Sequence, residues 1–303
     1  MEWRQRTNLF IVAALLVWLF ADAGRVRESA ADALRLCAAS VIPSLFPFLA
    51  ATGLLMSLGF GALASPWLSP LMTGLYRLPG AAGSALLLGL LGGYPVGART
   101  AADLYRLGQL TKDEAERLLT FCNNANPAFL LNALGVGVFH SSRAGLWLLL
   151  VHLLSALLTG LCFRGQVSPR NASPPTPAAQ PAFFPAFVEA VGNAASAMLR
   201  VCAFVVFFSV LARPLKNWNS PAAAPLVGLL ELFSLTPMLA PDSRGFVLAS
   251  VCAGWGGLSA LAQTAAVLEN TGLSIRPCLL GKTLQAVFSG ILAAVVTTLF
   301  RLF

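Results

Sequence analysis

The sequence predicts an all-α fold: a polytopic bundle of transmembrane helices, built from two inverted repeats and containing broken or re-entrant helices. Three observations lead to it: an apolar composition, long apolar runs interrupted by glycine, proline and asparagine, and an internal repeat. Hydrophobic residues make up 57% of the 303 positions and charged residues only 11%. A soluble domain carries about 25% charged residues, so this composition excludes one, and the high hydrophobicity excludes a disordered chain. We therefore expect an integral, multi-pass membrane protein.

The apolar runs divide the chain into two membrane halves. Residues 1–28 are expected to form an N-terminal transmembrane segment and residues 29–164 a first membrane repeat. Residues 165–188 are rich in proline and are expected to form a linker, followed by a second repeat at 189–303. The run 9–20 also fits a signal peptide, so cleavage is the alternative to a first span. In all, about eight to ten hydrophobic segments are expected to cross or enter the bilayer core.

Several interruptions predict local structure within the first half. Pro43 and Pro47 lie inside an apolar run and predict a kinked helix. The Gly-Gly-Tyr-Pro sequence at 92–95 ends one half-helix, and a helical pattern resumes after it. Thr111, followed three residues later by Glu114, predicts a capping box and a short water-facing helix.

Charge and cysteine content restrict the class of function. The net charge of +8 comes from basic residues scattered singly between apolar runs, which is typical of cytoplasmic loops that face anionic lipid and not of a nucleic-acid groove. The six cysteines include no CxxC pair, so neither a disulfide framework nor a metal site is expected. HExxH, GxSxG and phosphate-loop motifs are also absent from the sequence. We expect no enzyme activity and no cofactor.

An internal repeat accompanies the two halves. Residues 34–38 (Leu-Arg-Leu-Cys-Ala) recur at 199–203 (Leu-Arg-Val-Cys-Ala). Residues 92–110 align without gaps on 256–274, with eight identities in 19 positions. A duplicated carrier usually places its site at the repeat interface, so the two Gly-Gly breaks are expected to face each other near the bilayer midplane. The alternatives are a chance match, and glycines that serve only close helix packing.

The candidate solute-binding residues lie at and beside these breaks. Broken helices expose backbone polar groups, which are tolerated at membrane depth only where protein or a water-filled cavity satisfies them. Arg99 is expected to face such a cavity or a partner, with an interfacial anchor as the alternative. The predicted site comprises Gly92, Gly93, Tyr94, Pro95, Arg99, Asn123, Asn124, Asn126, Gly256, Gly257, Ser259 and Gln263.

The order and spacing of the motifs resemble a known family. These motifs are Val-Ile-Pro-Ser-Leu-Phe-Pro-Phe at 41–48, Gly-Gly-Tyr-Pro-Val-Gly-Ala-Arg at 92–99 and Phe-Cys-Asn-Asn-Ala-Asn-Pro-Ala-Phe at 121–129. They resemble the sporulation integral membrane proteins of the YlbJ (SpoVV) type, in the nucleoside-recognition (Gate) domain superfamily. The resemblance covers roughly residues 33–292 and implies a multi-pass carrier with two repeats of opposite orientation. In spore formers it implies movement of dipicolinate from the mother cell across the outer forespore membrane.

The resemblance and the residues together give a functional expectation. We expect a transporter of a small anionic solute, with dipicolinate (pyridine-2,6-dicarboxylate) as the leading candidate, working by alternating access. Arg99 and the asparagines would suit its carboxylates, and Tyr94 would stack on its ring. The alternatives are a carrier of a nucleoside-like or other small metabolite, and a non-transporting membrane scaffold for spore maturation. The expected partners are the solute, membrane lipid and no nucleic acid, while a coupling ion (H⁺ or Na⁺) and a homo-oligomer stay open.

Overall fold

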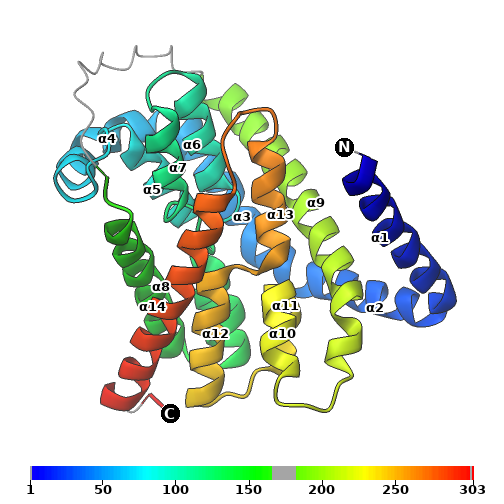
Figure 1. The fold of residues 1–303 in the computed structure, drawn as a ribbon. Helices are drawn as coiled ribbons and strands as arrows, with labels where there is room; N and C mark the ends of the chain where they lie inside the picture. Colours follow the sequence, from blue (N-terminus) through cyan, green and yellow to red (C-terminus); the bar gives the residue numbers. More distant parts are fainter. Residues whose placement is uncertain (1, 166–181, 301) are drawn as a thin grey trace.

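The computed structural model describes residues 2–165, 182–300 and 302–303, which form helices and loops with no strand among them. Figure 1 shows a bundle of tilted helices, which confirms the expected helical membrane fold. The first half contains, in order, α1 (Glu2–Ala21), α2 (Ala23–Leu36), the π-helix η1 (Cys37–Val41), α3 (Ile42–Ser57), α4 (Phe60–Pro70), the π-helix η2 (Leu71–Tyr76), α5 (Ala82–Gly92), α6 (Val96–Arg106), α7 (Lys112–Leu119), the π-helix η3 (Phe129–Val138) and α8 (Ser142–Cys162). The second half contains α9 (Phe183–Lys216), α10 (Ala223–Leu230), α11 (Leu232–Leu235), the 3₁₀-helix η4 (Thr236–Met238), α12 (Ser243–Trp255), α13 (Gly257–Leu268) and α14 (Arg276–Phe300).

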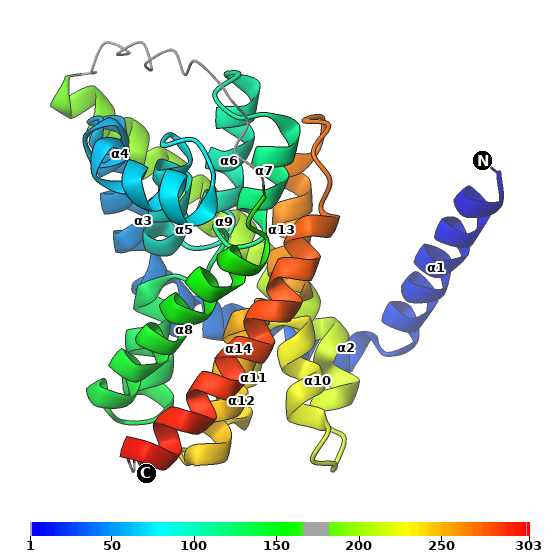
Figure 2. The same ribbon diagram turned by 60° about the vertical axis from the view of Figure 1, so that its left-hand side comes forward.

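The N-terminal helices contain two changes of direction, of which the sequence predicted the second. The chain bends by 93° between α1 and α2, and α1 stands apart from the bundle (Figure 2). An ion pair of 2.8 Å between Asp22 and Arg213 of α9 fixes this corner to the bundle. The expected kink before α3 is present: η1 directly precedes Pro43, whose missing N–H removes a helical hydrogen bond.

The first Gly-Gly segment reverses the chain. Helices α5 and α6 pack against each other as a hairpin, with Gly93, Tyr94 and Pro95 at its tip. Gly89 and Gly97 face each other across it, because a Cβ added at Gly89 would lie 2.9 Å from Gly97 Cα. The chain therefore turns back at residues 93–95, where the sequence predicted a break between two helical elements.

The second Gly-Gly segment does not reverse the chain. Gly256 and Gly257 have φ of +88° and +83°, and α12 and α13 on either side of them form one membrane-length span, Ser243–Leu268. The two breaks that the sequence alignment equated therefore differ in tertiary structure. The shared motif specifies an interrupted helix, whereas the packing of the flanking helices decides whether the chain turns back.

The aligned segments also run in the same direction, which contradicts an inverted relationship between them. Both α6 and α13 begin beside the same pocket, where Tyr94 and Gly256 lie. Both end on the same side of the bundle: Ser274, after α13, donates a 2.9 Å backbone hydrogen bond to Glu116 of α7, the helix that follows α6. Their similarity reflects local structure, since a glycine with positive φ ends each segment, at Gly108 and Gly272.

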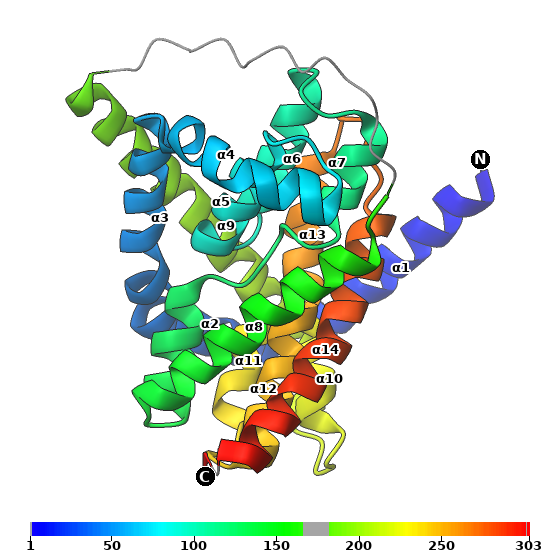
Figure 3. The ribbon, with the colours of Figure 1, turned by 90° about the vertical axis from the view of Figure 1, so that its left-hand side faces the viewer.

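Helices α8 and α14 do run in opposite directions and cross near their middles (Figure 3). Near one end the ring centroids of Trp147 and Phe300 lie 4.4 Å apart. Further along, Ser289 Oγ donates a 2.8 Å hydrogen bond to Ser155 Oγ. The antiparallel pair forms the rigid centre against which α12 packs.

The hydrophobic segments of the described residues differ in length. Four helices are long and apolar enough to cross a membrane, or five if the bent α1–α2 pair counts as one span. The other apolar runs form short helices such as α5 and η3, because glycine, proline and asparagine interrupt them. Of the predicted linker 165–188, residues 166–181 lie outside the described residues, and α9 already begins at Phe183.

Candidate solute-binding site

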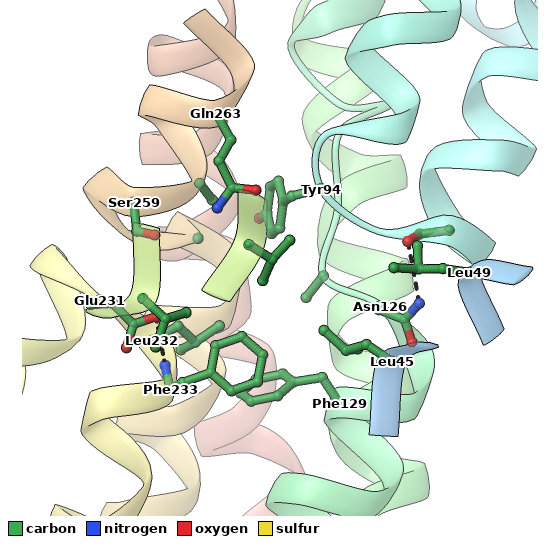
Figure 4. A pocket seen from close by; sticks show the side chains of 16 residues that line it. Leu45, Leu49, Tyr94, Asn126, Phe129, Glu231, Leu232, Phe233, Ser259 and Gln263 are labelled. Carbon is green, nitrogen blue, oxygen red and sulfur yellow. Dashed lines mark hydrogen bonds between the residues drawn. The ribbon is translucent and has the colours of Figure 1, made fainter. Parts of the chain in front are cut away.

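One pocket lies where four interruptions of the chain meet (Figure 4). They are the α5–α6 tip, the extended segment at 120–126 before η3, the turn between α10 and α11, and the α12–α13 break. The pocket is a narrow cavity of about 60 Å³. It is lined by Leu45, Leu49, Gly92, Tyr94, Ala125, Asn126, Phe129, Val201, Val205, Glu231, Leu232, Phe233, Gly256, Ser259, Ala260 and Gln263.

The turn at Glu231 forms a second helical hairpin. A Cβ added at Gly228 of α10 would lie 2.9 Å from a methyl carbon of Leu235, seven residues later, so α10 and α11 fold back on each other. The buried Glu231 carboxylate accepts a 3.1 Å hydrogen bond from the Phe233 backbone N–H and a second one from Ser234. This hairpin meets the pocket from the face opposite to the α5–α6 hairpin (Figure 1).

Polar groups lie on opposite walls of the pocket (Figure 4). Glu231, Ser259 and Gln263 lie on one wall, Asn126 lies on the other beside Leu45, and Tyr94 lies between them. Among the residues that the structure describes, the pocket lining includes no lysine or arginine. Apolar side chains, among them two phenylalanines, form much of the rest of the lining. Such a lining suits a small solute that has both an apolar face and hydrogen-bonding groups.

Asn126 joins two of the interruptions. Its Nδ2 donates hydrogen bonds of 3.2 Å to the carbonyl oxygens of both Leu91 and Gly92, at the end of α5. Its Oδ1 accepts a 2.7 Å hydrogen bond from the Ala128 backbone N–H, at the start of η3. One amide therefore satisfies backbone groups that two broken helices expose at membrane depth.

Asn123 and Asn124 are buried behind the pocket instead of lining it. Asn123 Nδ2 donates to Thr264 Oγ1 at 2.7 Å, which links the extended segment to α13. Asn124 Nδ2 donates to the Phe121 carbonyl at 2.8 Å, and its Oδ1 accepts a 3.0 Å hydrogen bond from Gln285 Nε2. Their role is to hold the unwound segment, since each amide supplies both a donor and an acceptor.

The structure places Arg99 outside the pocket. Arg99 is exposed and does not line the pocket, whereas Gly97, Ala98 and Ala101 are buried. The helical period places position 99 on the outer side of α6 once its small residues pack inward. The exposed position fits the alternative of an interfacial anchor.

The remaining predicted residues form two groups, those that line the pocket and those that lie beside it. Gly92, Tyr94, Asn126, Gly256, Ser259 and Gln263 line the pocket. Gly93, Pro95 and Gly257 lie at its breaks without lining it. Gly93 has φ of +78°, and a Cβ there would lie 2.8 Å from the Asn126 Cβ, so only glycine fits the tip.

Sequence reasoning did not select two charged residues for the site. Glu231 was visible as an acid in an apolar run. Lys282 is fully buried in α14, and its Nζ lies 5.0 Å from the centroid of the Tyr94 ring. The signal for Lys282 was a single lysine inside an apolar run of membrane-spanning length.

Comparisons with known proteins agree with the motif resemblance. Residues 38–142 match the Gate family, described as nucleoside recognition. The matched residues include the α5–α6 tip, Asn126 and η3, and they therefore supply one part of the pocket.

A curated relative covers most of the chain. Over 295 residues the chain is 28% identical to the sporulation integral membrane protein YlbJ of Bacillus subtilis (strain 168), with 83% of this chain and 72% of that protein covered. No solved structure matches the chain. The match to the Gate family, this relative and the apolar helices together support a multi-pass membrane protein with a transporter-like role.

Proposed function

We propose that the chain is a membrane carrier that binds a small solute in the pocket and moves it by alternating access. The observation that carries this proposal is the meeting of two hairpin tips and two helix breaks around one pocket. Carriers build their sites from discontinuous helices near the midplane, at the interface between repeats. Because the hairpins come from opposite faces, retraction of either one would open the pocket to a different side.

An inverted repeat in a different register supports the same mechanism. The structural order of α3, hairpin α5–α6, extended break and α8 corresponds to α9, hairpin α10–α11, the α12–α13 break and α14. In this register the crossing residues Ser155 and Ser289 occupy equivalent places in antiparallel helices. The asparagine-rich break then corresponds to Gly256 and Gly257. We propose this relationship in place of the one suggested by the sequence alignment.

Two solute classes are supported by different observations. Dipicolinate is the first candidate because the motifs resemble the YlbJ type and a curated relative is a sporulation integral membrane protein; the carrier would then act in the outer forespore membrane. A nucleoside-like, uncharged solute is favoured by the lining, because a dianion would face the Glu231 carboxylate without a lining cation. Both solutes combine a flat ring with polar groups, which matches a lining of apolar side chains and hydrogen-bonding groups.

Uptake into proteoliposomes tests the carrier and its solute together. Labelled dipicolinate and a labelled nucleoside are compared with the wild type, with Gln263→Leu and with Glu231→Gln. The exposed Glu269→Gln serves as the matched control for loss of a carboxylate. Gln263→Leu is expected to reduce saturable uptake of the true solute, because it removes both hydrogen-bonding groups of a pocket amide.

Glu231→Gln separates the two solute classes. If the solute is anionic, loss of the carboxylate is expected to lower its KM by about tenfold or more. If the solute is an uncharged nucleoside, the same change removes a strong acceptor and raises KM. Absence of flux of either solute through folded wild-type protein would favour the membrane scaffold.

A further inference from the structure

Lys282 is a fully buried cation at the junction of three elements that build the pocket. Its Nζ donates a 2.9 Å hydrogen bond to the backbone carbonyl of Asn123, in the unwound segment before η3. It donates a second one, of 2.6 Å, to Gln285 Oε1, one turn along α14. The Tyr94 ring, at the hairpin tip, lies 5.0 Å away and offers its π face.

Two neutral oxygens, a π face and the thiols of Cys122 and Cys278 surround this amino group, and no carboxylate among the described residues contacts it. None of the ion pairs found among the described residues includes Lys282. An isolated cation is expensive at membrane depth, so its retention points to a function. Carriers use carbonyl groups of unwound backbone to coordinate a coupling cation. The Lys282 ammonium contacts a group of that kind, the carbonyl of Asn123 in the unwound segment.

The contacts of Lys282 extend into both walls of the pocket. Gln285, which receives its hydrogen bond, in turn donates to Asn124 Oδ1 at 3.0 Å. Asn123, whose carbonyl it binds, reaches α13 through Thr264. The positive charge therefore joins α14, the unwound segment and the hairpin tip, and through them it orders Tyr94 at the pocket.

We propose that the Lys282 ammonium is a tethered substitute for a bound coupling cation, so that the pocket assembles without Na⁺. The inference rests on the proposed carrier function, because coupling has meaning only for a carrier. In a carrier coupled to a soluble ion, that ion binds and dissociates in each transport cycle. In this chain the positive charge would stay attached to α14.

Thermal unfolding of the purified full chain in detergent tests the proposal without requiring transport. Tm is measured in NaCl, KCl, choline chloride and ethylammonium chloride at equal ionic strength. The wild type is expected to give the same Tm in all four salts. Lys282→Ala is expected to lose about 5 °C or more and to recover part of the loss specifically in ethylammonium, which fits the space left by the side chain.

Lys282→Met and a surface lysine provide the controls. Methionine fills the space without charge, so its lower Tm should not respond to any of the cations. Lys112→Ala, at an exposed position of α7, should leave Tm unchanged. If Lys282→Ala cannot be purified from NaCl, its yield after extraction in ethylammonium is the measurement, and recovery is expected.

The outcomes separate this proposal from the carrier function. A wild-type Tm that rises specifically with Na⁺ overturns the tethered cation, as does a Lys282→Ala protein, or yield, that ethylammonium does not restore. Solute uptake is then compared in Na⁺ and in choline buffers. Equal uptake supports the proposal, and a Na⁺ requirement overturns it. If the expected Tm pattern is seen but no solute is taken up, the stabilising charge of Lys282 is supported and the carrier function is rejected.

Discussion

Ser289 Oγ donates a 2.8 Å hydrogen bond to Ser155 Oγ at the crossing of α8 and α14. Both side chains are fully buried, and Ser155 Oγ donates in turn to the His152 carbonyl at 2.9 Å. Small residues at this crossing let two membrane-length helices approach closely, and the hydroxyls satisfy one another. The contact fixes the register of two helices that run in opposite directions.

The crossing predicts a specific cross-link. Ser155→Cys combined with Ser289→Cys should form a disulfide under mild oxidation, because the two Oγ atoms are already within hydrogen-bonding distance. Electrophoresis after proteolytic cleavage between the halves would detect the linked fragments. Each single cysteine variant is the control for the native cysteines. If the double variant gives no linked fragments after oxidation, α8 and α14 do not cross at these two residues.

A side chain at Gly254 of α12 is expected to clash with α14 near the same crossing. A Cβ there would lie 2.6 Å from Ser289 Oγ and 2.9 Å from Ala286 Cα. Gly254→Ala should therefore lower the free energy of unfolding by about 1–3 kcal/mol, as overpacking of a close contact does, and reduce Tm.

Gly192→Ala is the matched control for the same substitution in a helix. Gly192 is exposed in α9, and a Cβ there meets no atom within 4 Å. Because alanine is a better helix former than glycine, Gly192→Ala should keep or slightly raise Tm. Equal Tm values for the two variants would contradict the close approach of α12 and α14.

Substitution of Asn126 is expected to reduce both stability and solute uptake. Asn126→Leu leaves the carbonyls of Leu91 and Gly92 and the N–H of Ala128 without this partner. Each unsatisfied buried group costs about 1–3 kcal/mol, so Tm should fall and solute uptake should be lost.

Asn132→Leu controls for loss of an amide in the same segment, because Asn132 is exposed on η3. It should leave Tm and uptake close to wild type. Asn126→Asp keeps the acceptor for Ala128 but sets a carboxylate against two carbonyl oxygens, and is expected to resemble Asn126→Leu. Normal uptake in both Asn126 variants would rule out the tie between hairpin tip and break.

Substitution of Arg99 is expected to have little effect on transport. Because its side chain is exposed and away from the pocket lining, Arg99→Ala should change KM and maximal uptake by less than about twofold, in the range usual for a surface change. Proteoliposome uptake, corrected for the amount of inserted protein, measures this. Loss of uptake with normal insertion would return Arg99 to the site and show that the pocket changes shape during transport.

The candidate site was partly predictable because backbone interruptions leave a direct signal. Gly92, Asn126 and Gly256 lie at breaks in apolar runs, Gln263 lies further along α13, and all four line the pocket. Arg99 lies outside the pocket because the distance of a residue from a break along the chain does not determine which side of the helix it occupies. Leu45 and Val205 were undetectable, since an apolar wall residue in a membrane helix resembles a lipid-facing one.

The sequence by itself determined the environment of this protein and the positions where its helices break. Composition requires a membrane, and Gly93, Asn126 and Pro43 interrupt helices through their own backbone preferences, which act locally. Only the tertiary structure decided that the chain reverses after Gly92 but continues through Gly256. It also decided that Lys282 lies beside Tyr94. Direction and proximity depend on which helices pack together, and packing joins residues far apart in the chain.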